Sequence, residues 1–230
     1  MKLIALIFFL FSTLFLQANE KIPFFIPPDK WTVSNPKTYS KHIKVAFTKK
    51  EKSPMRASLN LAMQKTDLSL DAYILQAKKL HEKDTNTKYT IIGTIDIKDG
   101  KANLSEIDKK IHSQNYKMLQ MIFVKDKTAY VMTAASKKNN FLENSQNFIK
   151  AFKSFELIDD PFSLITDSEK AKNLKQKYRD TTEGREKLNE KQIKKNLLTF
   201  EKYLDKNFQN LGQYFIILLT QKAYKKIKEF

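Results

Sequence analysis

The chain has 230 residues, a formal net charge of +17 and no cysteine. Without cysteine it has no disulfides, no thiolate metal sites and no cysteine nucleophile, and its four dispersed glycines form no phosphate-binding loop. The 41% hydrophobic content is typical of a globular protein with a buried core. The positive charge favours anionic partners, but lysines occur in every segment, so charge alone defines no binding site.

The first 18 residues have the layout of a secretory signal peptide. Lys2 provides a basic start, residues 3–16 (LIALIFFLFSTLFL) are apolar apart from one serine and one threonine, and Ala18 offers a small residue for cleavage. The apolar run is shorter than the roughly 20 residues that span a bilayer comfortably. We therefore expect an exported protein, periplasmic or secreted, that begins at residue 19. An uncleaved N-terminal anchor is the alternative.

The next segments predict two strands and a helix. Residues 21–30 (KIPFFIPPDK), named here the opening segment, contain three prolines and should be extended. Trp31, the only tryptophan, is expected to plug the core at the sheet edge, with a ligand-stacking role as the alternative. Alternating apolar residues predict strands over 42–48 and 56–63. Apolar residues at helical spacing then predict a helix from Leu70 to Leu80.

Two hairpins should follow this helix. The first is predicted over residues 89–107, where two alternating runs flank an Asp-Gly turn. The second, over residues 116–136, has two mostly apolar faces, so we expect it at the centre of the sheet with a cover on each side. The predicted covers are the Leu70–Leu80 helix and a second helix over residues 141–152. Because hairpins dominate, the expected fold class is α+β with an antiparallel sheet.

In this arrangement the chain resembles the PsbP-like domains. These include an extrinsic photosystem protein, a eukaryotic Ran-binding relative and exported bacterial proteins. The resemblance covers residues 21–157 and implies an antiparallel sheet layered between helices, with a binding or assembly role. No ligand-binding motif of the family is matched, so no site residue is carried over. The resemblance rests on Trp31 in its proline-flanked segment, the Leu70–Leu80 helix, the strand KTAYVMTAAS with Tyr130, Val131, Ala134 and Ala135, and the closing FKSFEL with Ser154 and Phe155.

The domain is expected to occupy residues 19–158, because Asp159, Asp160 and Pro161 form a break that disfavours a continuing helix. Residues 159–230 predict an all-α, basic extension with a weakly amphipathic helix over 168–180. A longer apolar stripe follows at spacings close to a heptad seam, interrupted by Gly212. The stripe consists of Ile193, Leu197, Phe200, Leu204, Phe208, Leu211, Phe215 and Leu218.

Three interpretations of this stripe stay open. It folds back as a helical hairpin or onto the domain, it docks on a partner as in a coiled coil, or it lies in a membrane interface with lysines on the headgroups. The last two make the C-terminal end a candidate partner or membrane contact. The candidate contact residues are Phe208, Leu211, Phe215, Leu218, Lys222, Lys225, Lys226 and Lys228.

No catalytic, cofactor-binding or metal-binding residues are predicted. His42, His81 and His112 lie far apart in the sequence, without the spacing of a metal-binding helix. No nucleic-acid-binding module is present, and export argues against such a partner. We therefore expect a non-enzymatic binding or assembly protein of the cell envelope with a protein partner. The alternative is a peripheral membrane-surface protein held by a basic amphipathic C-terminal helix.

Overall fold

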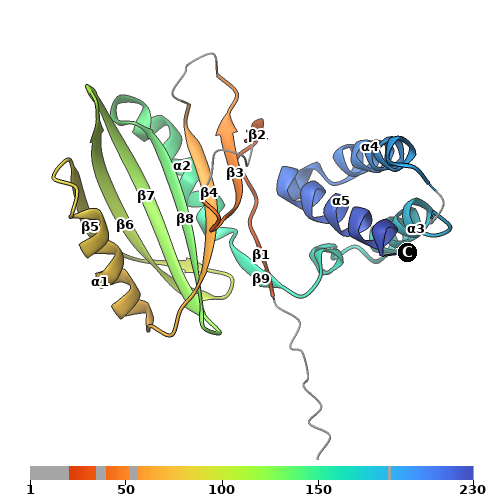
Figure 1. The fold of residues 1–230 in the computed structure, drawn as a ribbon, viewed down its shortest axis with the longest axis horizontal. Helices are drawn as coiled ribbons and strands as arrows, with labels where there is room; N and C mark the ends of the chain where they lie inside the picture. The colour runs from red at the N-terminus through yellow and green to blue at the C-terminus, as the bar shows by residue number, and fades with distance from the viewer. Residues whose placement is uncertain (1–20, 35–39, 52–55, 186–187, 230) are drawn as a thin grey trace, which may run out of the picture.

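The computed structural model describes residues 21–34, 40–51, 56–185 and 188–229. A large β-sheet with two helices forms one part, and three helices at the C-terminal end form the other (Figure 1). The predicted signal peptide, residues 1–18, lies outside the described residues.

The main sheet has seven strands, all antiparallel, in the order β2-β3-β4-β8-β7-β6-β5. The predicted fold class is confirmed, and the predicted central hairpin is β7-β8, with β8 as the middle strand. Asp126 and Lys127 join these strands with φ angles of 50° and 55°, which matches a two-residue hairpin turn with left-handed central residues. The strands are β2 (Trp31–Val33), β3 (Ile43–Lys49), β4 (Ser58–Lys65), β5 (Thr87–Ile97), β6 (Gly100–Ile111), β7 (Gln114–Lys125) and β8 (Thr128–Lys137).

A second, two-stranded sheet fastens the opening segment to the end of the domain. It pairs β1 (Ile22–Phe24) with β9 (Glu156–Ile158) in antiparallel register. Beside it, the backbone N–H of Ile26 donates a hydrogen bond of 2.8 Å to Oγ of Ser154. The sequence predicted an extended opening segment but not this pairing, because a three-residue strand is too short to show an alternation period.

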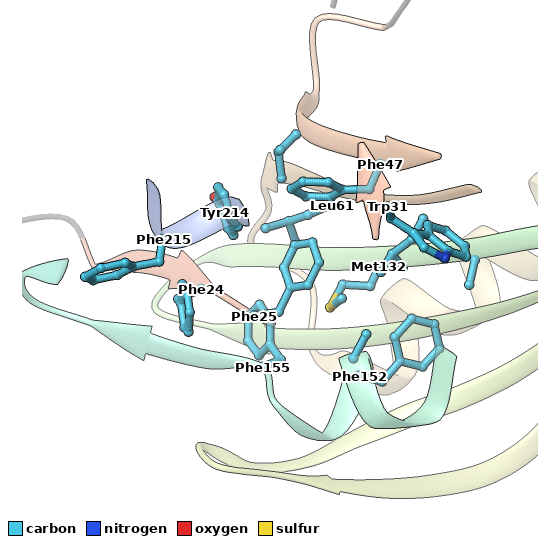
Figure 2. Packing of buried hydrophobic residues seen from close by; sticks show 14 of the residues in the cluster. Phe24, Phe25, Trp31, Phe47, Leu61, Met132, Phe152, Phe155, Tyr214 and Phe215 are labelled. Atoms are coloured by element: carbon cyan, nitrogen blue, oxygen red, sulfur yellow. The ribbon is translucent and has the colours of Figure 1, made fainter. Parts of the chain in front are cut away.

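The main core lies between one face of the sheet and helix α2 (Phe141–Lys153). Figure 2 shows Phe152, Phe155 and Met132 among its side chains. Trp31 is 5% exposed, and its ring meets that of Phe148 edge-on with centroids 6.0 Å apart. The tryptophan is therefore a core residue, as the sequence predicted.

Helix α1 (Leu70–His81) lies on the opposite face of the sheet, in front of β5 and β6 in Figure 1. Oγ of Ser69 caps it by accepting a hydrogen bond from the backbone N–H of Ala72. Ile74 is its one buried residue, while Leu80, expected on its apolar face, is 66% exposed. The prediction that α1 covers the central hairpin is thus only half right, because much of the β4 and β8 face carries no helix (Figure 1).

The last residue of α1, His81, is expected to make the stability of the fold sensitive to acid. The His81 ring stacks on Tyr89 with centroids 5.3 Å apart. Burial first, and the charge of Lys109 second, lower the pKa of His81 below its usual 6.5. Since the unfolded chain then binds the proton more readily, stability from the neutral ring is complete above pH about 6.5 and declines as the pH falls below it.

We therefore expect the free energy of unfolding to fall between pH 7 and pH 5, and to fall less steeply in His81→Phe. Urea denaturation of both proteins at the two pH values measures this difference. Equal slopes in the two proteins would contradict the assignment.

Three helices form the C-terminal part: α3 (Ser168–Thr182), α4 (Glu190–Asn207) and α5 (Gly212–Lys228). The apolar stripe is folded into their shared interior, where Phe200, Leu204 and Phe215 have no exposed surface. The fold-back interpretation therefore holds, and Gly212 marks the bend at which the chain turns from α4 into α5. The N-terminal end of α5 packs on the opening segment through Tyr214 (Figure 2).

Candidate functional site

A groove of about 460 Å³ runs along the C-terminal half of α5, where this helix passes the opening segment and the turn after β9. Its apolar lining comes from four segments that are distant in sequence, and basic residues of α5 form its rim. The lining residues are Ile22, Pro161, Tyr178, Leu218, Gln221, Lys222, Lys225, Lys226 and Glu229. We call this feature the α5 groove.

Lys222 and Tyr178 are held in place by neighbours from other elements. Lys222 forms an ion pair with Asp160, and its Nζ lies 5.7 Å from the ring centroid of Phe162. The hydroxyl of Tyr178 donates a hydrogen bond of 3.3 Å to the backbone carbonyl of Lys222. Burial, and next the charge of Asp160, raise the pKa of Tyr178 above its usual 10, so this hydroxyl keeps its proton at neutral pH.

Lys225 and Lys226 follow Lys222 at helical spacing, so α5 presents all three lysines on one side. Lysines also suit the last turns of a helix, because they compensate the negative end of its dipole. That role explains their presence but not the apolar hollow beside them. The combination of an apolar floor and an ammonium rim can hold a partner that carries both an apolar group and a carboxylate or phosphate.

The structure brings Leu218, Lys222, Lys225 and Lys226 of the predicted contact residues together in this groove. Lys228 lies outside it and forms an ion pair with Glu190 of α4.

The remaining three predicted contacts belong to the packing of the helices, which corrects the prediction for two of them. Phe208 and Phe215 are 3% and 0% exposed, because the stripe closes the interior of the three helices rather than facing outward. Leu211 is partly buried against the same core. The apolar side of α5 is therefore already used inside the molecule.

Ile22, Pro161 and Tyr178 were not predicted as part of a site. They come from the opening segment, the turn after β9 and α3, and only the tertiary structure places them beside α5. The sequence around each of them indicates only an ordinary packing or turn residue. No local signal in the sequence could have grouped them.

Within the described ranges, no group of three or more His, Asp or Glu side chains is placed to hold a metal ion. Among the same residues, no helix combines the length and the apolar character that crossing a membrane requires.

Comparison with known proteins gives information on the fold of this chain only. No family profile and no curated protein matches the sequence. Among solved structures, LpqN of Mycobacterium tuberculosis, described as involved in cell envelope biogenesis, aligns at 8% identity and a TM-score of 0.48, over 63% of this chain and 87% of LpqN. A cyanobacterial PsbP from Synechocystis aligns at 12% identity and a TM-score of 0.44, over 64% of this chain and 98% of its own.

The Ran-binding protein Mog1p of Saccharomyces cerevisiae aligns at 9% identity and a TM-score of 0.44, over 62% of this chain and 97% of its own. The solved structures that align with this chain thus include PsbP and Mog1, the proteins that the resemblance in the sequence names. At these identities the likeness describes the fold and does not extend to function.

Proposed function

We propose that this is an exported, non-enzymatic binding protein of the cell envelope that holds an acidic segment of a partner protein in the α5 groove. The observation that carries this proposal is an apolar floor beside three lysines of α5, of which Lys222 is paired with Asp160 while Lys225 and Lys226 follow it on the same side of the helix. Such a groove suits a short peptide segment with an apolar side chain flanked by Asp or Glu. The apolar group fills the hollow while the carboxylates reach the ammonium groups.

The shape of the site favours a protein segment over a bilayer surface. A helix that lies in a membrane interface must present its apolar face to the acyl chains. Phe215, Leu219, Ala223 and Ile227 of α5 are instead buried in the protein. A flat membrane would touch the lysine rim, but it could not fill the hollow behind it.

Pull-down from the native envelope fraction tests the proposal, with the chain from residue 19 onward as bait. The double variant Lys225→Glu/Lys226→Glu is expected to lose the specific partner at least tenfold, because it opposes the acidic segment with two new negative charges. The matched control is Lys194→Glu/Lys195→Glu on α4, which makes the same charge change at two exposed lysines outside the groove. The control is expected to retain the partner.

Equal retention by both variants would contradict the role of the groove. A peripheral membrane function predicts a different result, namely strong, salt-sensitive co-sedimentation with phosphatidylglycerol vesicles. We expect only weak co-sedimentation, lowered to a similar degree by both double variants, since general attraction depends on net charge.

A further inference from the structure

A second hollow, between α1 and the sheet, differs from the α5 groove in its chemistry. It has a volume of about 220 Å³ and lies on the face opposite the main core. We call it the α1 pocket. Its lining residues are Gln64, Tyr73, Gln76, Ala77, Leu80, His81, Gln120, Ile122 and Val131.

None of these side chains carries a charge at neutral pH. In the whole chain 29% of residues are Asp, Glu, Lys or Arg, so a pocket without any of them stands apart from the rest of the surface. His81 is the one lining residue whose side chain titrates near neutral pH. Burial lowers its pKa and the charge of nearby Lys109 lowers it further, so the ring is neutral at pH 7. A ligand that enters the pocket would meet no charged side chain in its lining, and the nearby Lys109 is already paired with Asp84. The pocket therefore disfavours ions, which would lose hydration without gaining a partner.

Gln120, on the floor of the pocket, has hydrogen-bonding capacity that its neighbours in the protein do not use. Gln120 is 7% exposed; its Oε1 accepts a bond of 3.3 Å from the Tyr89 hydroxyl and its Nε2 donates one of 3.4 Å to Oγ1 of Thr133. A carboxamide has two N–H groups and an oxygen with two lone pairs. Among the described residues no partner takes the second N–H of Gln120. At the rim, Gln64 accepts from the Tyr73 hydroxyl at 3.0 Å.

The sheet beside the pocket continues this uncharged surface. Thr133 of β8 stands opposite Asn60 of β4 on one side and Gln120 on the other, so the three side chains share one face. Asn60 and Thr133 are half-buried. A ligand can thus place its apolar end against Ile122 and Val131 and its polar head on Gln120 and Gln64, next to these further amide and hydroxyl groups.

We propose that the α1 pocket binds a small neutral ligand with a short apolar chain and an amide- or hydroxyl-type head. The volume of about 220 Å³ is below the roughly 300–1,000 Å³ of sites for drug-sized molecules, which fits one short chain. Ile122 and Val131 provide the apolar floor, while Gln120 and Gln64 supply donors and acceptors. This site is independent of the α5 groove, which lies on another element and selects for negative charge.

Three probes that share a five-carbon tail and differ only in the head test this inference. They are hexanamide, which is neutral, hexanoate, which is anionic, and pentylammonium, which is cationic. Titration of the isotope-labelled chain, followed by NMR chemical shifts, reports both affinity and location. Hexanamide is expected to shift the resonances of α1, β7 and β8 and to bind at least tenfold more tightly there than either ion.

Two variants separate the apolar and polar parts of the pocket. Ala77→Phe should fill it and abolish the hexanamide shifts, while Leu75→Phe, at a position 54% exposed on the same helix and outside the lining, should leave them unchanged. Gln120→Leu keeps a similar volume and is expected to weaken hexanamide several-fold.

Equal binding of all three probes, shifts confined to other elements, or full binding by both Ala77→Phe and Gln120→Leu would overturn the proposal. If Ala77→Phe fails to fold, Gln120→Leu and the probe series still decide it. Chemical-shift changes on α5 caused by hexanoate would report binding to the α5 groove, which is a separate site from the α1 pocket.

Discussion

Replacing Tyr214 with alanine is expected to lower the free energy of unfolding by about 3–5 kcal/mol, the usual loss for a buried aromatic side chain. Tyr214 is 5% exposed and joins α5 to the sheet domain (Figure 2). Its ring lies 6.0 Å from that of Phe24, 5.2 Å from that of Phe25 and 6.2 Å from that of Phe47. Truncation would therefore leave a cavity that three other rings line.

Urea denaturation measures this loss with two probes. Fluorescence of Trp31 reports on the sheet, because it is the only tryptophan and packs against Phe148. Far-ultraviolet circular dichroism is dominated by the helices. Tyr214→Phe, which keeps the ring, should stay within about 1.5 kcal/mol of the parent protein. A loss below about 1 kcal/mol in Tyr214→Ala would show that α5 does not depend on this contact.

The substitution Gly212→Ala is expected to lower the free energy of unfolding by about 1–3 kcal/mol through backbone strain alone. A steric clash adds to this loss. Gly212 has φ 71° and ψ 177°, a region that residues with a side chain essentially avoid. A Cβ atom at this position would lie 2.9 Å from Cδ of Pro27 and 3.3 Å from its Cγ. The glycine therefore permits both the bend into α5 and the close approach of the opening segment.

Two further variants separate the backbone cost from the steric cost. Gly184 also has a positive φ, 65°, but a Cβ there would meet nothing within 4 Å, so Gly184→Ala should show a smaller, purely conformational loss. Pro27→Ala removes the atoms that the new Cβ would strike. The double variant Gly212→Ala/Pro27→Ala should therefore lose less than the sum of the two single losses, as measured by urea denaturation. Strict additivity would rule out the proposed clash.

The sheet was largely predictable from local patterns. The hairpins β5-β6 and β7-β8 follow from alternation and short turns, since a period of two places alternate side chains on opposite faces. The main cover, α2, follows from phenylalanines at helical spacing. By contrast, β1, β2 and β9 have three residues each, which is too few for a period to be detected. Their positions depend on pairing with distant strands.

The candidate site was only partly predictable. The basic end of α5 was recognised from Lys222, Lys225 and Lys226, but Phe215 was assigned to a contact surface and is in fact core. An apolar stripe at heptad spacing has the same sequence pattern whether its partner is another protein or a neighbouring helix of the same chain. Burial was decided by the bend at Gly212, which returns α5 alongside α4.

The sequence by itself determined the antiparallel hairpins, the two helices of the sheet domain and the helical character of the last third, because each depends on the period of neighbouring residues. Only the tertiary structure decided which helix face is buried, how little of the sheet α1 covers, and which distant residues line the two hollows. Both the α5 groove and the α1 pocket arise where elements fail to close against each other. The shape of such a gap depends on packing between segments far apart in the chain, which no local pattern records.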